Sequence, residues 1–233
     1  MELNIGNRQL FADIETERTK KMASLCSDSS FAEKDLLAVL DTYKRREPEI
    51  EKALAYAKTL DFSKNHLRSS YLSHPIRLAT FLVMIDPQIG TDYIVIALLH
   101  NVPETTSITA ETLTELFGPT VGSGIKALVV DRKAVFAEIR NEYYRNIFAK
   151  GTSLVLVKLI DKIDNLFVLG LNADDAVRKE YIMEIREELL PFAREYDQQL
   201  GSYLERLLED TAARGYSKEL KDQLNQYQES IKP

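Results

Sequence analysis

Three residues of types that ligate divalent metals lie far apart in the chain, each in or beside a predicted helix. His74 opens one such helix after a polar loop, and His100 ends an apolar run that starts at Ile94. Asp161 lies within the apolar segment 152–169, where an ionised carboxylate is costly to bury unless it is paired or bound to a metal. Two imidazoles and one carboxylate suit a borderline divalent cation such as Mn, Fe or Zn. Convergence of the three helices would therefore create a metal centre.

Each of these residues also has a simpler interpretation. A lone histidine such as His74 or His100 is more often a helix cap or a core residue than a ligand. Lys158 lies three residues before Asp161 and Asn165 lies four after it, so the three form one polar stripe on an apolar helix. Lys158 can then neutralise Asp161 in an ion pair. The residues alone leave both interpretations open.

Glu104 is a candidate for acid–base chemistry. It follows His100 by four residues, one helical turn if the helix continues through Pro103. A carboxylate there would be placed to take a proton from a metal-bound water. The alternative is a capping acid ahead of the helix predicted from Thr109. The chain contains no glycine-rich phosphate loop, GxSxG motif or CxxC motif, so nucleotide binding by those devices is not predicted.

Composition and charge exclude several classes of protein. The chain has 233 residues, is 45% hydrophobic, and contains Cys26 as its single cysteine, so an intrachain disulfide is excluded. No segment approaches the ~18 apolar residues of a membrane span, and the first residues do not have the pattern of a secretory signal. A net charge of -6 gives no general attraction for nucleic acid or anionic lipid. We expect a soluble, cytoplasmic protein.

The hydrophobic pattern is helical throughout. Apolar residues recur three and four positions apart, which predicts an all-α protein built as one helical bundle. Helices are expected at residues 30–45, 47–60, 74–85, 91–101, 109–117, 119–130, 133–149, 152–169, 173–214 and 217–230. Gly118 followed by Pro119 predicts a sharp break between two helices, and Pro191 predicts a kink or break in the long segment 173–214.

Several segments, taken in order, resemble the HD-domain metal-dependent phosphohydrolases. More narrowly, they are similar to the hydrolase domain of the RelA/SpoT-type alarmone (guanosine tetraphosphate) enzymes. The similar stretch runs from Glu49 to Tyr196 and includes the motifs RSSYLSHP (68–75), ALLHNVPETT (97–106), LFGPTV (116–121) and VKLIDKIDN (157–165). We therefore expect an HD-like hydrolase domain over residues 31–214 and a C-terminal helix at 215–233. The pattern along the chain adds the expectation of an N-terminal helical extension at 1–30 that is loosely attached.

The resemblance also implies roles for particular positions. The metal, most commonly Mn with Fe, Zn or Co as alternatives, would be held at the positions of His74, His100, Asn101 and Asp161. The acidic pair that handles the attacking water corresponds to Glu104 and Thr105. The nucleotide pocket would be lined by Arg68, Lys158 and Asn165. The family's reaction removes the 3′-pyrophosphate of the alarmone, so the implied partner is a small phosphorylated molecule, a nucleotide.

Two positions depart from that pattern where activity is decided. Residue 101 is Asn where the defining pair of the family has Asp, and residue 105 is Thr where the family has an acid. A neutral amide oxygen at Asn101 predicts a weaker metal site. Glu104 retains a carboxylate that can act as a base. The sequence does not predict the oligomeric state.

Three hypotheses follow. The first is a divergent metal-dependent phosphohydrolase acting on a nucleotide or another small phosphoester. The second is a catalytically impaired nucleotide-binding module of the same fold, with Asn101 and Thr105 as the disabling changes. The third is a helical interaction protein that uses the segment 173–214 as its partner face; the same segment reads equally as a solvated face over a core stripe.

Overall fold

The computed structural model describes residues 12–27, 29–62, 71–130 and 136–230, and within them every regular element is helical. The α-helices are α1 (Ile14–Leu25), α2 (Ser30–Thr42), α3 (Pro48–Lys58), α4 (Ser73–Ile85), α5 (Thr91–Leu99), α6 (Val102–Thr105), α7 (Ala110–Phe117), α8 (Pro119–Leu128), α9 (Phe136–Phe148), α10 (Thr152–Leu166), α11 (Asp175–Glu184), α12 (Leu190–Tyr196), α13 (Gln198–Arg214) and α14 (Lys218–Ser230). The predicted all-α bundle is confirmed. None of the helices in the described ranges has the length and apolar character needed to cross a membrane.

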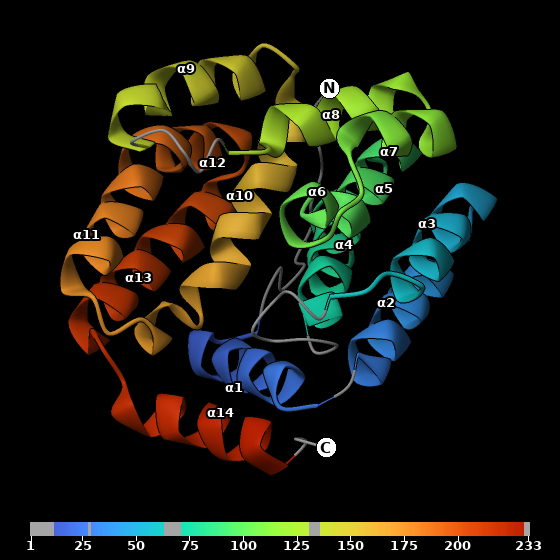
Figure 1. Cartoon of the computed structure of the whole chain (residues 1–233). Helices are drawn as coiled ribbons and strands as arrows, with labels where there is room; N and C mark the ends of the chain where they lie inside the picture. Colours follow the sequence, from blue (N-terminus) through green and yellow to red (C-terminus); the bar gives the residue numbers. More distant parts are fainter. Residues whose placement is uncertain (1–11, 28, 63–70, 131–135, 231–233) are drawn as a thin grey trace.

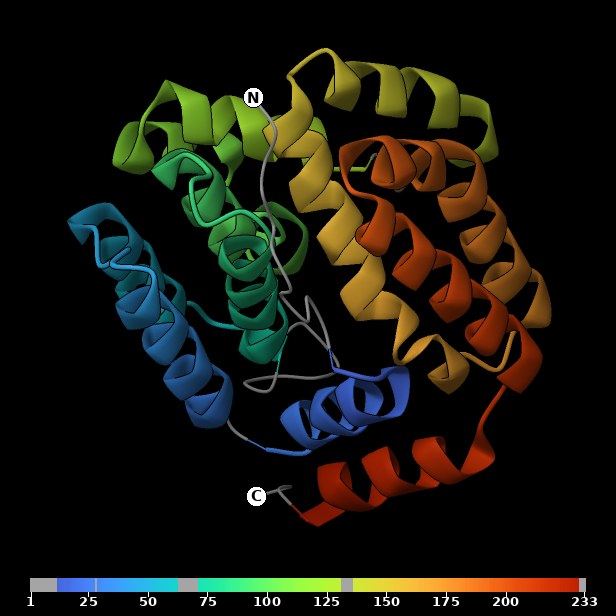
Figure 2. The same ribbon diagram turned by 180° about the vertical axis from the view of Figure 1, so that it is seen from behind.

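Helix α10 occupies the middle of the bundle. It packs against α4 and α5 on one side and against α9 and α13 on the other, as Figure 1 shows. The view from behind in Figure 2 shows α2 and α3 outside α4 and α5, with α11 to α13 grouped beyond α10. Most of α10 is buried, including its four charged residues, because it is covered from both sides. A polar side chain on α10 therefore needs a partner inside the protein.

Glycine and proline set two of the breaks that bring α5 to α8 together. Gly118 has a φ of 92°, a conformation that glycine adopts without steric cost, and it separates α7 from α8 as predicted. The helix predicted over 91–101 ends earlier, at Leu99, and α6 begins at Val102. Pro103 lies in the first turn of α6, where its missing N–H costs nothing. This break places His100 and Asn101 at a corner between two helices.

The segment 173–214 differs most from its prediction. Pro191 does not interrupt the chain direction but lies in the first turn of α12, after a π-helical turn at Ile185–Leu189. The reversal lies at Asp197, whose carboxylate accepts the Leu200 N–H at 2.8 Å and caps α13. Helix α13 then packs closely on α12, where a Cβ on Gly201 would lie 2.7 Å from the Cα of Arg194. The apolar stripe of this segment lies largely in the core, which argues against the third hypothesis.

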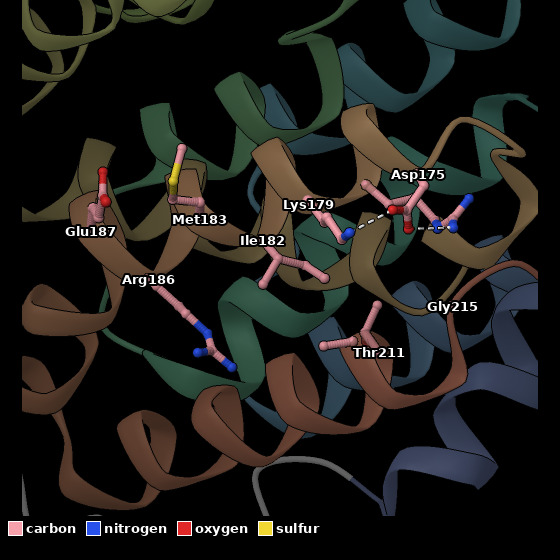
Figure 3. Close-up of a pocket in the computed structure, with 10 residues that line it drawn as sticks. Asp175, Lys179, Ile182, Met183, Arg186, Glu187, Thr211 and Gly215 are labelled. Atoms are coloured by element: carbon pink, nitrogen blue, oxygen red, sulfur yellow. Dashed lines mark hydrogen bonds and ion pairs between the residues drawn. The ribbon is translucent and has the colours of Figure 1, made fainter.

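A cavity of about 370 Å³ lies between α11 and α13 (Figure 3). Asp175 on its rim pairs with Lys179 at 2.7 Å and with Arg178 at 2.9 Å. None of the residues predicted to hold a metal or a nucleotide is among those that line it. This hollow is therefore separate from the candidate site described below.

The two terminal helices of the described chain cross one end of the bundle, α1 next to α14 (Figure 1). Met22, Leu25 and Leu224 form a small apolar cluster between them. The prediction of a loosely attached N-terminal helix is wrong, because α1 buries charged side chains in ion pairs with the bundle. Arg18 pairs with Asp210 of α13, and Lys21 pairs with Asp164 of α10.

Candidate metal centre

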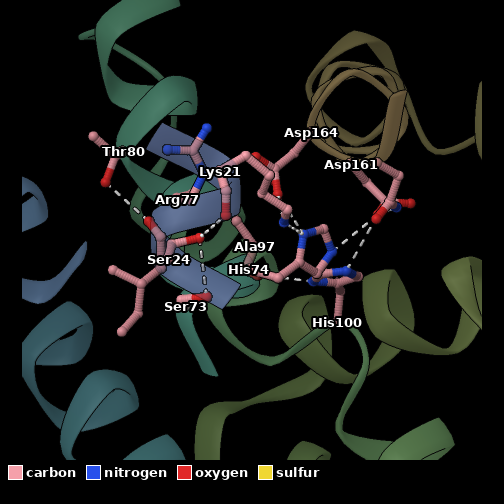
Figure 4. Close-up of polar contacts among 12 residues, drawn as sticks. Lys21, Ser24, Ser73, His74, Arg77, Thr80, Ala97, His100, Asp161 and Asp164 are labelled. Atoms are coloured by element: carbon pink, nitrogen blue, oxygen red, sulfur yellow. Dashed lines mark hydrogen bonds and ion pairs between the residues drawn. The ribbon is translucent and has the colours of Figure 1, made fainter. Parts of the chain in front are cut away.

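The three predicted metal ligands converge from separate helices. His74 comes from the first turn of α4, His100 directly follows α5, and Asp161 lies in the middle of α10. One ligand atom from each residue lies within 4.8 Å of the others, and all three residues are buried. The Oδ1 atom of Asp161 lies 3.2 Å from Nε2 of His74 and 3.7 Å from Nε2 of His100. Figure 4 shows both rings directed at this oxygen.

Hydrogen bonds at the other ring nitrogen indicate which tautomer each histidine adopts. Nδ1 of His100 lies 2.8 Å from the carbonyl oxygen of Ala97, an atom that can only accept. Nδ1 of His74 lies 2.7 Å from Oδ2 of Asp164. Both Nδ1 atoms therefore act as donors, and in a neutral imidazole the lone pair is then on Nε2. Both Nε2 atoms are available as ligands.

The two Nε2 atoms are buried and have no hydrogen-bond partner. Each lone pair faces the carboxylate of Asp161, an arrangement that is repulsive unless a positive charge lies between the groups. Burial and Lys21 lower the pKa of His74, yet the neighbouring carboxylates of Asp161 and Asp164 raise this pKa above its usual value. The site therefore favours a positive charge beside Nε2, and a divalent cation fits these donors.

Asp161 is held as a carboxylate by its neighbours on α10. Lys158 donates to Oδ2 at 3.0 Å, and Asn165 donates to Oδ1 at 2.9 Å. Burial raises the pKa of Asp161, but Lys158 and the two histidines hold it well below its usual value. The ion pair with Lys158 is thus formed. It uses the oxygen turned away from the histidines, so it is compatible with a metal on Oδ1.

A cavity of about 700 Å³ adjoins the cluster, a size typical of small-molecule sites. His74, Asn101 and Asn165 line one part of it, so the structure brings these three predicted residues together. The remaining wall includes aromatic and cationic side chains: Tyr71, Tyr181, Tyr216, Lys21 and Lys221. Aromatic faces can stack on a base, and lysines can neutralise phosphate charge.

Other predicted site residues are placed differently. Thr105 donates its hydroxyl to the carbonyl oxygen of Asn101 at 2.7 Å, within its own helix. Glu104 accepts the N–H of Val130 at 3.3 Å and lines a separate cavity near α8. Arg68 lies outside the described residues. The roles assigned to these three residues therefore stay predictions.

Sequence analysis missed three residues around His74. Asp164 accepts from His74, from Arg77 at 2.9 Å, and from Lys21 of α1. The argument applied to Asp161 would have found Asp164, because it lies three residues later on the same apolar helix. Neither Lys21 nor Arg77 gave a signal, since charged residues at such positions are most often solvated.

Comparison with known proteins identifies distant relatives. No protein-family model matches the chain. It is 31% identical over 150 residues to the GTP pyrophosphokinase rsh of Brucella melitensis, a match that covers 59% of this chain and 20% of the relative. Over 167 residues it is 29% identical to a guanosine-3′,5′-bis(diphosphate) 3′-pyrophosphohydrolase of Aquifex aeolicus. This match covers 69% of this chain and 23% of the relative. The chain thus spans about a fifth of the length of these relatives.

A shorter relative and a solved structure show the same similarity to alarmone hydrolases. The guanosine-3′,5′-bis(diphosphate) 3′-pyrophosphohydrolase MESH1 of Drosophila melanogaster is 29% identical over 109 residues. The match covers 47% of this chain and 61% of the relative. A solved structure described as a metazoan ortholog of SpoT that hydrolyses ppGpp matches with a TM-score of 0.57 and 23% identity, over 70% of this chain and 96% of that chain. The chain is a distant homologue of alarmone-hydrolase HD domains and shares their fold.

Proposed function

We propose that this protein is a metal-dependent phosphohydrolase acting on a phosphorylated nucleotide, with removal of a 3′-pyrophosphate as the first reaction to test. One observation carries the proposal: two buried Nε2 atoms without partners face one oxygen of a buried carboxylate. The names of the relatives supply the substrate class.

Each residue of the centre has a distinct task. His74, His100 and Asp161 would hold the cation, with the amide oxygen of Asn101 as a fourth, neutral ligand. A divalent metal, Mn first among Mn, Fe, Zn and Co, supplies a Lewis acid and lowers the pKa of a bound water. Lys158 keeps Asp161 ionised through its contact with Oδ2. The side chain of Asp161 therefore stays a carboxylate, with Oδ1 facing the two histidines.

The adjoining cavity would bind the substrate. Lys221 and Tyr216 approach it from the C-terminal end of the chain, and Asn165 approaches it from α10. In this proposal Arg68 or Lys158 offsets phosphate charge, and Glu104 accepts a proton from the attacking water. One oxygen of Glu104, Oε1, accepts the Val130 N–H at 3.3 Å.

A second candidate function is nucleotide binding without hydrolysis. It is favoured by the local chemistry at residues 101 and 105. The Thr105 hydroxyl donates to the carbonyl oxygen of Asn101, and neither residue carries a negative charge. The cavity and the metal ligands would then serve recognition alone.

The test is a turnover assay on chain stripped with a chelator and reloaded with Mn²⁺, Fe²⁺, Co²⁺ or Zn²⁺. The substrates are a panel of phosphorylated nucleotides that includes guanosine tetraphosphate. We expect pyrophosphate release that Asp161→Asn abolishes and Glu184→Gln retains, since Glu184 is a buried carboxylate that does not touch the candidate ligands. The absence of both metal binding and turnover would refute the proposal. Calorimetric binding of a nucleotide without turnover, with activity gained in an Asn101→Asp, Thr105→Asp double variant, would establish the second candidate.

A further inference from the structure

We propose that Asp164, held in place by Lys21 and Arg77, is a positioning residue that keeps the proton of His74 on Nδ1 and so leaves Nε2 free to ligate. Helix α1, which supplies Lys21, thereby becomes part of the candidate metal centre. The proposal deepens the proposed function and rests on it for its consequence, metal affinity. Its core statement, the protonation pattern of one ring, holds or fails without any metal.

The immediate contacts of Nδ1 support this assignment. Asp164 Oδ2 lies 2.7 Å from Nδ1, whereas the ammonium of Lys21 lies 3.4 Å from the same atom (Figure 4). A carboxylate can only accept and an ammonium can only donate, so the shorter contact decides that Nδ1 is the donor. Lys21 is closer to Asp164 than to the ring and makes an ion pair with it. A histidine that donates one nitrogen to a carboxylate and ligates through the other is a common arrangement in metal sites.

Asp164 is fully buried, and its charge is compensated inside the protein. Arg77 donates Nε to its Oδ1 at 2.9 Å, and Lys21 contacts its Oδ2. Glu17 of α1 lies 3.5 Å from the other end of the Arg77 guanidinium. The two acids and two bases form a neutral set, which a buried ionic network requires. Burial raises the pKa of Asp164, but Lys21 and Arg77 hold it well below its usual value.

His100 and His74 differ in the group that accepts a hydrogen bond from Nδ1. His100 donates Nδ1 to the carbonyl of Ala97, three residues earlier in its own chain segment. Its tautomer is fixed by a backbone carbonyl of its own chain segment. His74 depends instead on a residue of α10 and, through it, on α1. Lys21 lies outside the stretch from Glu49 to Tyr196 that resembles the hydrolase family.

The substitution Asp164→Asn removes the charge and makes the tautomer ambiguous. The amide has one acceptor, and Lys21, Arg77 and His74 compete for it. Wherever the amide group faces Nδ1, the proton of His74 moves to Nε2 and blocks the ligand atom; a misplaced tautomer of this kind also disables a catalytic triad. We expect the affinity for Mn²⁺ to fall about 10- to 100-fold, the usual cost of losing such a contact.

The experiment is long-range ¹⁵N–¹H NMR of the metal-free chain, above the pH at which its imidazoles titrate. The chain has only three histidines, His66, His74 and His100, so the spectrum can be assigned by substitution. We expect His74 and His100 to be Nδ1-protonated in the native chain. In Asp164→Asn, His74 should move toward the Nε2-protonated form while His100 stays unchanged. The proposal is overturned if His74 is Nε2-protonated in the native chain, or if Asp164→Asn leaves both its tautomer and Mn²⁺ affinity unchanged.

Two control pairs separate positioning from loss of stability. Glu184→Gln removes a buried carboxylate that accepts from Lys162 and Tyr144, and it should alter neither the His74 tautomer nor calorimetric Mn²⁺ affinity. On α1, Lys21→Met should disturb the His74 signal, whereas Arg18→Met, which breaks the pair with Asp210, should not. Equal effects of the two α1 variants would overturn the role of Lys21. An Nδ1-protonated His74 in a chain that binds no metal would refute the proposed function and leave the positioning role intact.

Discussion

Asp161 on α10 and Glu184 on α11 are both buried carboxylates that pair with a lysine, but the atoms around them differ. Glu184 accepts the Tyr144 hydroxyl at 2.6 Å on one oxygen and the Lys162 ammonium at 2.7 Å on the other. Asp161 also pairs with a lysine, yet its Oδ1 faces two nitrogen atoms that lack partners. Burial and a lysine partner are common to both. The comparison shows that unsatisfied ligand atoms, rather than buried charge, distinguish a candidate site from a structural ion pair.

The largest effect is expected at the structural cluster. Glu184→Gln leaves Lys162 buried without its counter-charge, and breaking a buried pair in this way costs about 3 kcal/mol of unfolding free energy. Urea denaturation followed by circular dichroism measures this cost. Calorimetry should give an unchanged Mn²⁺ affinity. A loss of metal binding in this variant would erase the distinction between the two clusters.

At the candidate centre, a substitution should weaken metal binding more than it lowers the free energy of unfolding. Asp161→Asn keeps the shape of the side chain but removes the only charged ligand among the four positions predicted to hold the metal. Losing a group that merely contacts a ligand costs about 10- to 100-fold in metal affinity, so this change should cost at least about 100-fold. Titration with Mn²⁺ checks it. An affinity within a few-fold of the native value would show that the carboxylate is not a ligand.

Asn101→Asp is expected to strengthen the centre. A carboxylate at this position adds a negative charge on the cavity wall that His74 also lines, and we expect Mn²⁺ to bind about tenfold more tightly. Asn172→Asp, elsewhere on the same cavity, is the matched control and should change affinity less. Equal gains from both variants would mean that general charge, not ligation, is responsible.

The smallest effect concerns the cavity wall supplied by α14. Lys221→Ala removes a half-buried cation from the cavity and should weaken nucleotide binding by about two- to fivefold, with a smaller difference at high salt. Lys218→Ala, also on α14 but not among the residues lining the cavity, should leave binding unchanged. Calorimetry at two salt concentrations separates the two variants, and identical behaviour would remove α14 from the binding surface.

Much of the helical architecture was predictable because its signals are local. The break at Gly118, the apolar α10 and the corner after His100 all follow from residue types within a few positions. The hairpin of α12 and α13 was not predicted. The sequence analysis placed the break at Pro191, whereas the chain reverses at Asp197, which caps α13. Proline opens a helix as readily as it ends one, and only tertiary packing shows which applies.

The candidate site was predictable where residue type alone implied a need for partners. His74, His100 and Asp161 meet as expected, and the ion pair of Lys158 with Asp161 exists beside them. The contribution of α1 was not predictable, because nothing in the sequence around Lys21 indicates burial. Contacts between residues 143 positions apart depend on how the bundle closes.

The most direct test of the central claim is electron paramagnetic resonance of Mn²⁺ titrated into chelator-treated native chain, compared with His74→Ala. If the two unpartnered nitrogen atoms and Asp161 form a metal centre, the native chain binds one Mn²⁺ per molecule and His74→Ala loses that binding. Absence of binding in the native chain, or equal binding in the variant, would contradict the claim.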